Sequence, residues 1–301
     1  MRRLYTAYNL VIESDIALPE LVELEGDATA PPDAVIRFGK ASRESLTNGR
    51  QVEYDLWADR SGIWLDIGTV ARFLVQDGNK ISVEPYPEAT EDSLRLFILG
   101  SALGALLSQR DYLVLHGNAV RIGNQCMVCV GDSGAGKSTL AAGFMQRGFQ
   151  VLADDVVAVD DECRAVPGFP RIKLWQHAAD QLNIDTRSLR RIRSDLEKYN
   201  VPVRQAFDNV PVPIRWIYIL GSDRIEGVTF QPVNGLDRFE PLLANTYRFN
   251  FVEGMALAKD HLRRCGQLAG KIQLTRVTRP RDGFGLDVLI DELLAQMAEH
   301  P

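Results

Sequence analysis

The stretch Gly131–Ser138, which reads GDSGAGKS and is followed by Thr139, constrains the fold more than any other part of the chain. It satisfies G-x-x-x-x-G-K-[ST], the pattern of a loop between a strand and a helix that holds phosphates. Its three glycines let the backbone turn its N–H groups inward. Lys137 would add a positive charge near the β- and γ-phosphates, and Ser138 a hydroxyl for Mg²⁺. The residues predicted to contact the nucleotide are Gly131, Asp132, Ser133, Gly134, Ala135, Gly136, Lys137, Ser138 and Thr139.

The pattern of the chain changes near residue 110. Up to about residue 88, short alternating apolar runs separated by turns predict an antiparallel β-meander, and residues 90–110 predict a helix capped by Thr90 or Asp92. From Tyr112 onward, strands, the glycine loop, a helix and a further strand follow in under 50 residues, as in a βαβ unit. We therefore predict an α/β protein with a β-rich N-terminal domain (1–110) and a P-loop catalytic domain (111–301).

Composition narrows the function classes. Of 301 residues, 34 are Lys or Arg and 40 are Asp or Glu, and this net charge of −6 argues against binding nucleic acid through bulk positive charge. Residues 1–110 hold 11 basic against 17 acidic residues, whereas 111–301 balance at 23 each. The longest apolar stretch, 96–107, is too short to span a bilayer, and no secretory signal is expected.

The cysteines predict a location. Cys126 and Cys129 form a C-x-x-C, but they lie in the apolar run QCMVCV, where side chains three apart point to opposite faces of a strand. They are expected to be core thiols rather than a redox pair or metal ligands. Four cysteines in a chain of this length form no disulfide framework, which favours a cytoplasmic protein.

Asp154 and Asp155 lie in a predicted strand, QVLADDVV, 17 and 18 residues beyond Lys137. Hydrophobic residues flank them on both sides, which argues against a solvated surface. Neighbouring side chains on a strand point opposite ways, so a division of labour is expected: one would hold Mg²⁺, and the other would accept the proton of an incoming hydroxyl. Ser138, Asp154 and Asp155 are the predicted metal-linked residues.

His116 lies in the predicted strand 112–123 and alone would be a structural hydrogen-bonding residue. Together, HGNAVRIG, CVGDSGAGKST, a helix ending in Arg-Gly and VLADDVV resemble the catalytic domain of HPr kinase/phosphorylase over residues 112–160. This resemblance implies that Lys137 and Ser138 bind nucleotide and metal. It also implies that one of the two aspartates activates an acceptor serine, and that His116 borders the same site.

The sequence also departs from that family. The family carries a later E-x-R-G-x-G stretch, associated with the phosphorylase reaction and with recognition of its substrate, and the corresponding region here reads RAVPGFPRIKLW. This puts the reverse reaction and HPr itself as the substrate in doubt. The sequence is more similar to the HPr-kinase-like proteins of lasso peptide gene clusters, which phosphorylate a serine of a ribosomally made precursor peptide.

Three basic residues are predicted to contact substrate or phosphate: Arg171 and Lys173, two apart on an extended segment, and Lys198. The predicted catalytic residues are Asp154, Asp155, His116 and Lys137, with ATP and Mg²⁺ as cofactors. The expected activity is transfer of the γ-phosphoryl group to a serine of a peptide or protein, with no nucleic-acid or membrane partner, and association of copies stays open. The alternatives are a nucleotide-binding sensor or slow NTPase whose N-terminal domain binds a partner, an HPr serine kinase, and a small-molecule kinase.

Overall fold

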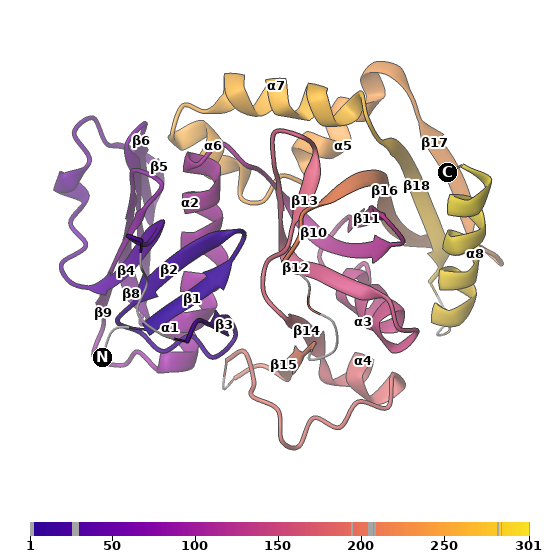
Figure 1. The fold of residues 1–301 in the computed structure, drawn as a ribbon, viewed down its shortest axis with the longest axis horizontal. Coiled ribbons are helices and arrows are strands. Elements are labelled where there is room, and N and C mark those ends of the chain that lie inside the picture. The colour runs from indigo at the N-terminus through magenta and orange to yellow at the C-terminus, as the bar shows by residue number, and fades with distance from the viewer. Residues whose placement is uncertain are drawn as a thin grey trace.

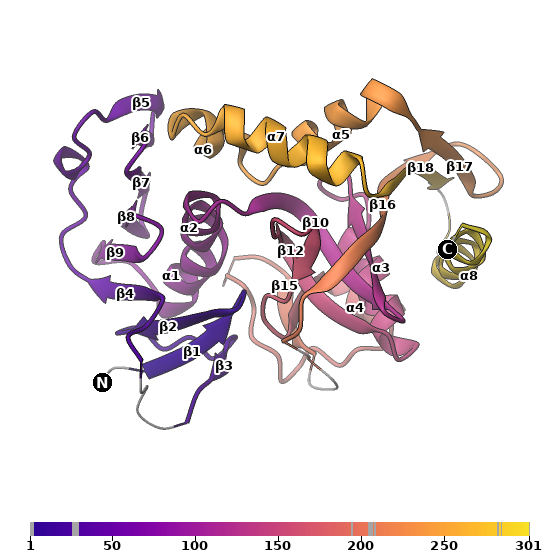
Figure 2. The same ribbon diagram turned by 45° about the horizontal axis from the view of Figure 1, so that its top comes forward.

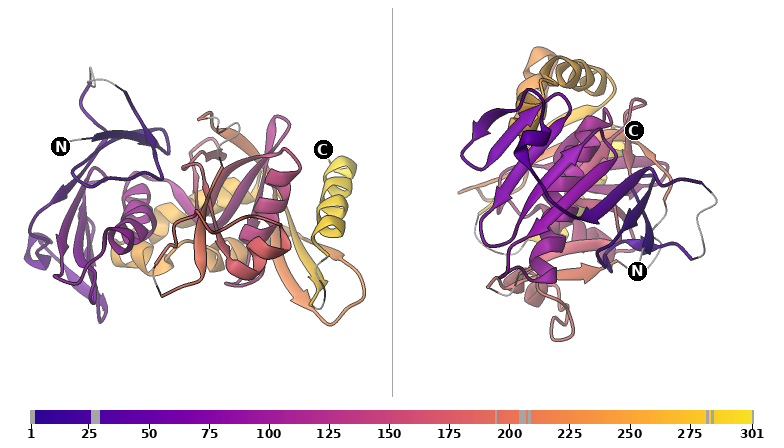
Figure 3. Two further views of the ribbon diagram at one scale, coloured as in Figure 1. Left: turned by 90° about the horizontal axis from the view of Figure 1, so that it is seen from below. Right: turned by 90° about the vertical axis from the view of Figure 1, so that its left-hand side faces the viewer.

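The computed structural model describes residues 3–300 except 26–29, 194, 204–206, 208, 282 and 284. Its strands form two large sheets that lie side by side, with a helical segment between them (Figures 1 and 3). The first sheet contains only strands that precede the phosphate loop, and the second contains those that flank and follow it.

Within the described residues, the first sheet has nine strands in the order β3-β1-β2-β4-β9-β8-β7-β6-β5. These strands are β1 (Arg3–Ala7), β2 (Leu10–Ser14), β3 (Val22–Glu23), β4 (Ala34–Phe38), β5 (Arg50–Glu53), β6 (Leu56–Asp59), β7 (Gly62–Ile67), β8 (Ala71–Gln76) and β9 (Lys80–Pro85). Strands β5–β9 form the expected antiparallel meander. The expectation is wrong at β4, which runs parallel to both β2 and β9 because the chain crosses over before entering it.

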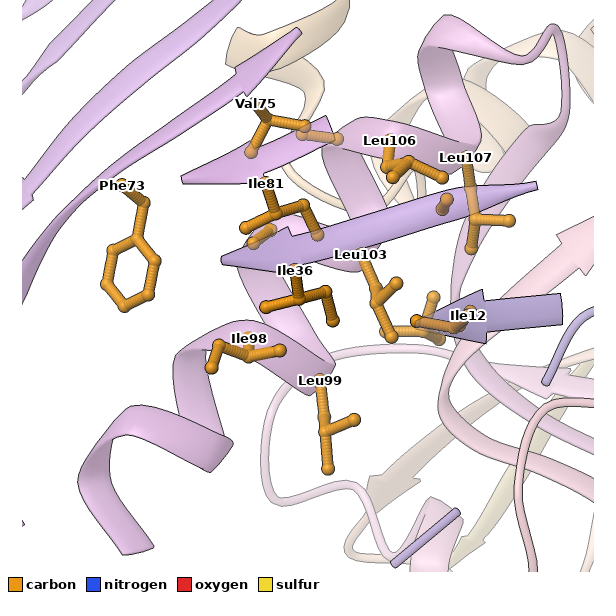
Figure 4. Packing of buried hydrophobic residues seen from close by; sticks show 14 of the residues in the cluster. Ile12, Ile36, Phe73, Val75, Ile81, Ile98, Leu99, Leu103, Leu106 and Leu107 are labelled. Carbon is orange, nitrogen blue, oxygen red and sulfur yellow. The ribbon is translucent and has the colours of Figure 1, made fainter. Parts of the chain in front are cut away.

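One helical segment follows the first sheet and covers it. It consists of α1 (Glu91–Phe97), a π-turn η2 (Ile98–Ala102) and α2 (Leu103–Gln109). Thr90 caps it: its side chain accepts from the N–H of Ser93, and the Ser93 hydroxyl accepts from the N–H of Thr90. The apolar run 96–107 is thus a buried helix that packs on the sheet, as Figure 4 shows for the labelled residues Ile12, Ile36, Ile81, Leu99, Leu103 and Leu106.

In the part of the chain that the structure describes, the second sheet has seven strands in the order β11-β10-β12-β13-β16-β18-β17, and β11 also pairs with β16. They are β10 (Leu113–Ile122), β11 (Gln125–Val130), β12 (Gln150–Val159), β13 (Arg164–Val166), β16 (Val212–Asp223), β17 (Thr229–Val233) and β18 (Gln273–Pro280). A separate two-stranded antiparallel sheet is formed by β14 (Arg171–Trp175) and β15 (Lys198–Pro202).

Helices cover both faces of the second sheet. One face packs against α3 (Lys137–Gln146) and α8 (Leu286–Glu299), and the other against α5 (Phe239–Ala244) and α7 (Ala258–Ala269). The short elements are η1 (Arg43–Ser45), α4 (Gln176–Gln181), η3 (Gly235–Arg238) and α6 (Phe249–Gly254). Cys126 and Cys129 are free and buried, as expected. Among the helices of the described residues, none is long and apolar enough to cross a membrane.

The chain returns to the first sheet before it adds β18 to the second sheet. Helix α6 lies against β5 and β6, where Arg50 donates to the carbonyl of Glu253 (2.9 Å), and α7 then leads back along the second sheet (Figure 2). One hydrophobic cluster accordingly contains residues from both sheets. It includes Ile12 of the first sheet, Val156 of the second sheet and Phe251 of α6. The first sheet therefore shares a continuous core with the strand that carries the aspartate pair.

Candidate active site

The glycine loop connects β11 to α3, as its pattern predicts. Gly131, Gly134 and Gly136 have φ values of 135°, 84° and 102°, which side-chain-bearing residues rarely adopt. At Gly131 a Cβ atom would also overlap the carbonyl oxygen of Leu220. The loop therefore needs glycine for conformation and, at its first position, for space.

Lys137, the first residue of α3, folds back over the loop. Its ammonium donates to the carbonyls of Gly131 (2.6 Å) and Asp132 (3.0 Å), and its own carbonyl accepts from the Asn118 side chain (2.5 Å). Burial lowers the pKa of the Lys137 ammonium, against the attraction of the nearby aspartates. The cation is thus held at the loop, where the phosphates of a bound nucleotide would lie.

Strand order and register bring the aspartates to the loop. Strand β10 lies between β11 and β12 and is antiparallel to both, so β11 and β12 run parallel. Gly117 of β10 is opposite Val130, which precedes the loop, on one side and opposite Asp155 on the other. The loop and the aspartate pair are therefore separated by the width of a single strand.

Asp154 is joined directly to the loop helix. The Ser138 hydroxyl donates to its Oδ1 (2.9 Å), and the Lys173 N–H donates to its Oδ2 (2.8 Å). Burial raises the pKa of this carboxyl group, only partly offset by those hydrogen bonds. A hydroxyl and a carboxylate at hydrogen-bond distance are oxygen ligands of the kind Mg²⁺ takes, with phosphates and water completing its shell.

Asp155 departs from the predicted geometry. Its φ is 77°, a left-handed value within β12, so the side chains of Asp154 and Asp155 do not alternate. Both line the same cavity. The expectation that they point opposite ways is wrong, because it assumed regular strand backbone at this position.

The surroundings of Asp155 keep it ionised. Its Oδ2 accepts from the Lys173 ammonium (2.6 Å), and its Oδ1 lies 3.4 Å from Nδ1 of His116. Burial alone would raise the pKa of Asp155, but the charge and hydrogen bond of Lys173 hold it well below the ordinary range. Burial also lowers the pKa of His116, whose Nδ1 lies 3.1 Å from the Asp155 carbonyl oxygen. The pKa of Asp154 is therefore raised, whereas the pKa of the adjacent Asp155 is lowered.

The three predicted basic residues have different positions. Lys173 and Lys198 line the cavity, and the Lys198 ammonium lies 5.5 Å from the Trp175 ring centre. Arg171 lines neither of the two cavities described here; it is buried, donates to Asn200 (3.0 Å) and lies 3.9 Å from Glu20. The prediction that Arg171 contacts phosphate has no support from this geometry, because strand pairing and Glu20 hold its guanidinium away from the cavity.

The main cavity has a volume of about 840 Å³, enough for a nucleotide, and is bounded by the later half of the loop and by the aspartates. Of the predicted site residues, those that line it are His116, Ser133, Gly134, Gly136, Lys137, Ser138, Thr139, Asp154, Asp155, Lys173 and Lys198. Gly131 and Asp132 instead line a second cavity of about 560 Å³, which shares Ser133, His116, Asp155 and Lys173 with the first. Ala135 lines neither cavity, and its carbonyl faces Arg279.

Sequence reasoning missed several residues of this site. Arg279, at the end of β18, donates to the carbonyl of Ala135 (3.2 Å) and lines the main cavity. Asn245 accepts from the N–H of Gly131 (2.8 Å), and its carbonyl accepts from the N–H of His116 (2.7 Å). The basic run TRPR at 278–281 could have indicated Arg279 as a site residue. No local sequence pattern indicates Asn245, because only the folded chain brings it to the loop.

Comparison with known proteins assigns no family. No protein-family model matches the sequence, and no curated protein matches it. Among solved structures, an HPr(Ser) kinase/phosphatase from Coxiella burnetii aligns at 13% identity with a TM-score of 0.34, over 62% of this chain and 95% of that one. This TM-score is too low to transfer a fold family or an activity.

Proposed function

We propose that the chain is an Mg²⁺-dependent phosphotransferase that moves the γ-phosphoryl group of ATP to a serine of a peptide or protein. The observation that carries the proposal is the hydrogen bond between Ser138 and Asp154 beside a second, ionised carboxylate, Asp155, on the same cavity. A metal-binding pair and a separate carboxylate at a phosphate loop are the parts that phosphoryl transfer to a hydroxyl needs.

Each residue has a role in this proposal. In this proposal the loop N–H groups and Lys137 bind the β- and γ-phosphates. Ser138 and Asp154 would hold Mg²⁺, which would supply positive charge beside the transferred group. Asp155 orients the acceptor hydroxyl and takes its proton, and His116 and Lys173 hold that carboxylate in position. Lys198 faces the same cavity and is placed to meet an anionic group.

The motif resemblance narrows the acceptor. The order His-Gly, GDSGAGKS and ADD, together with the RAVPGFPRIKLW segment, favours a ribosomally made precursor peptide, as in lasso peptide clusters, over HPr. In this proposal the protein is cytoplasmic, and its partner is the peptide that carries the serine.

Transfer of label from [γ-³²P]ATP to serine peptides tests the proposal. Asp154→Asn and Asp155→Asn are each expected to lower transfer about 10²–10⁴-fold while nucleotide binding persists, because neither carboxylate is needed to hold the phosphates. Lys137→Ala is expected to weaken both binding and transfer. Asn tolerates left-handed φ, so Asp155→Asn keeps the local backbone.

Three results would contradict the proposal. Transfer at the wild-type rate in both aspartate variants would remove their assigned roles. Release of phosphate without any labelled acceptor would favour the nucleotide-binding sensor or slow NTPase. Label found only on small hydroxyl compounds would favour a small-molecule kinase.

A further inference from the structure

The second cavity lies next to the main cavity and shares four lining residues with it: His116, Ser133, Asp155 and Lys173. It contacts the first part of the phosphate loop, 131–133, whereas the main cavity contacts Ser133, Gly134 and residues 136–139. Asp155 borders both. A nucleotide in the main cavity therefore leaves the second cavity as a separate approach to Asp155.

A wall of the second cavity comes from the helical segment that covers the first sheet. Gly100 and Ser101 of the π-helical turn η2 line it, beside Tyr247. A Cβ at Gly100 would lie 3.2 Å from the Tyr247 hydroxyl, and one at Gly104 only 2.7 Å from its ring. These two glycines allow the Tyr247 ring to lie against the helix, so the N-terminal part of the chain shapes this cavity.

The mouth of the second cavity carries an exposed cation. Arg248 lines it with a φ of 48°, so this cavity is bordered by two non-glycine residues in left-handed backbone, Arg248 and Asp155. Such backbone is unfavourable for residues that carry a side chain, and it concentrates at functional sites. The guanidinium lies 6.0 Å from the Tyr247 ring centre and 5.5 Å from that of Phe251. The ion pairs among the described residues do not include Arg248.

The remaining charges in the cavity limit where an anion can bind. Its carboxylates are Asp132 and Asp155, and Asp155 already pairs with Lys173 (2.6 Å). Burial lowers the pKa of His116 and raises the pKa of Tyr247 to about 12, so burial disfavours the charged form of both groups. Arg248 is thus the cation of this cavity without a described anionic partner.

We propose that the second cavity admits the acceptor segment, and that Arg248 binds an acidic side chain next to the serine that is phosphorylated. This inference rests on the proposed function. In the transfer step, the serine oxygen forms a bond to Pγ while the serine O–H proton passes to the Asp155 carboxylate. The bond from Pγ to the bridging oxygen breaks, and ADP leaves with that electron pair.

Peptides that differ only at one flanking residue test the inference. Acetylated and amidated peptides with a central serine next to Glu, Gln or Lys are incubated with wild-type enzyme, Mg²⁺ and [γ-³²P]ATP. We expect kcat/KM for the Glu peptide to exceed that for the Gln peptide about tenfold, since a hydrogen bond to a charged group contributes that much. Arg248→Glu and Arg248→Gln should abolish this preference, and Arg248→Lys should retain part of it.

Two further variants separate charge from space. Lys259→Glu, on α7 and outside both cavities, makes the same charge reversal as Arg248→Glu and should leave the preference intact. Ala244→Trp adds bulk at an exposed residue that lines only the second cavity and should raise the KM for every peptide. Binding of a fluorescent ATP analogue reports whether each variant is folded.

The outcomes distinguish this inference from the proposed function. Peptide labelling without a preference for Glu, or a preference that Arg248→Glu and Arg248→Gln both preserve, overturns the inference while the kinase assignment stands. An unchanged KM in Ala244→Trp overturns the second cavity as the route of entry. If wild-type enzyme labels no serine peptide, the proposed function fails and the inference fails with it.

Discussion

Asp155 combines a strained backbone with a charge that its surroundings stabilise. Its left-handed φ directs the carboxylate toward Lys173 and His116. The ion pair with Lys173 offsets part of the free energy that is needed to remove this carboxylate from water. Without a cationic partner, that free-energy cost would be large. The ion pairs among the described residues do not include the neighbouring Asp154, and burial raises the pKa of its carboxyl group.

Lys173→Met should therefore shift the pH dependence of transfer. Without the ammonium, burial would dominate and raise the pKa of Asp155, so the carboxylate would protonate at a higher pH. The acid limb of kcat against pH is expected to move upward, and Lys173→Arg should restore part of the wild-type profile. An unchanged acid limb in Lys173→Met would show that Asp155 is not the group whose ionisation transfer requires.

At the scale of elements, the β1–β2 hairpin supports the strand that carries the aspartates. Tyr8, at the turn of this hairpin, donates its hydroxyl to the carbonyl of Val156 (3.1 Å), the residue after Asp155. Its own N–H donates to the carbonyl of Pro167 (2.9 Å). Glu20 also connects the two parts of the chain. Its Oε1 lies 3.3 Å from Nε of Arg95 on α1 and 3.9 Å from a guanidinium nitrogen of Arg171 on β14.

Tyr8→Phe should destabilise the protein by about 1–2 kcal/mol, because the buried Val156 carbonyl loses its donor while the ring still fills its space. Tyr54→Phe is the matched control, since the Tyr54 side chain is 95% exposed and should tolerate the change. Urea unfolding with a fixed m-value measures both. Equal stability of the two variants would mean that the Tyr8 hydroxyl contributes nothing.

At the scale of the whole molecule, hydrophobic packing and hydrogen bonds join the two sheets. The hydrophobic cluster around the first sheet includes Val114, Val156 and Phe169 from the part of the chain after residue 110. Arg50 and Arg60 also donate to the carbonyls of Glu253 and Ala256. Separation of the sheets would expose this apolar surface to water.

We therefore expect one cooperative unfolding transition for the full chain and no stable fold for residues 111–301 alone. Calorimetric and van't Hoff enthalpies of the full chain should agree. The fragment should lack near-ultraviolet circular dichroism. Two separated transitions, or a fragment with native dichroism, would show that the predicted domains 1–110 and 111–301 are independent.

The sequence alone determined the local features. The glycine loop, the helix after Thr90, the meander strands and the candidate residues on β10 and β12 follow from patterns within a few residues, because turn chemistry, capping and apolar periodicity act over short distances. The same patterns led to the choice of Lys137, Ser138 and both aspartates, which the fold brings to one cavity.

Only the tertiary structure decided what depends on pairing between distant segments. The left-handed backbone of Asp155, the separation of Arg171 from the cavity, and the positions of Arg279, Asn245 and Arg248 arise from strand register and from packing across more than 100 residues of chain in several cases. Such long-range contacts depend on which surfaces bury one another, and no short stretch of sequence records that choice.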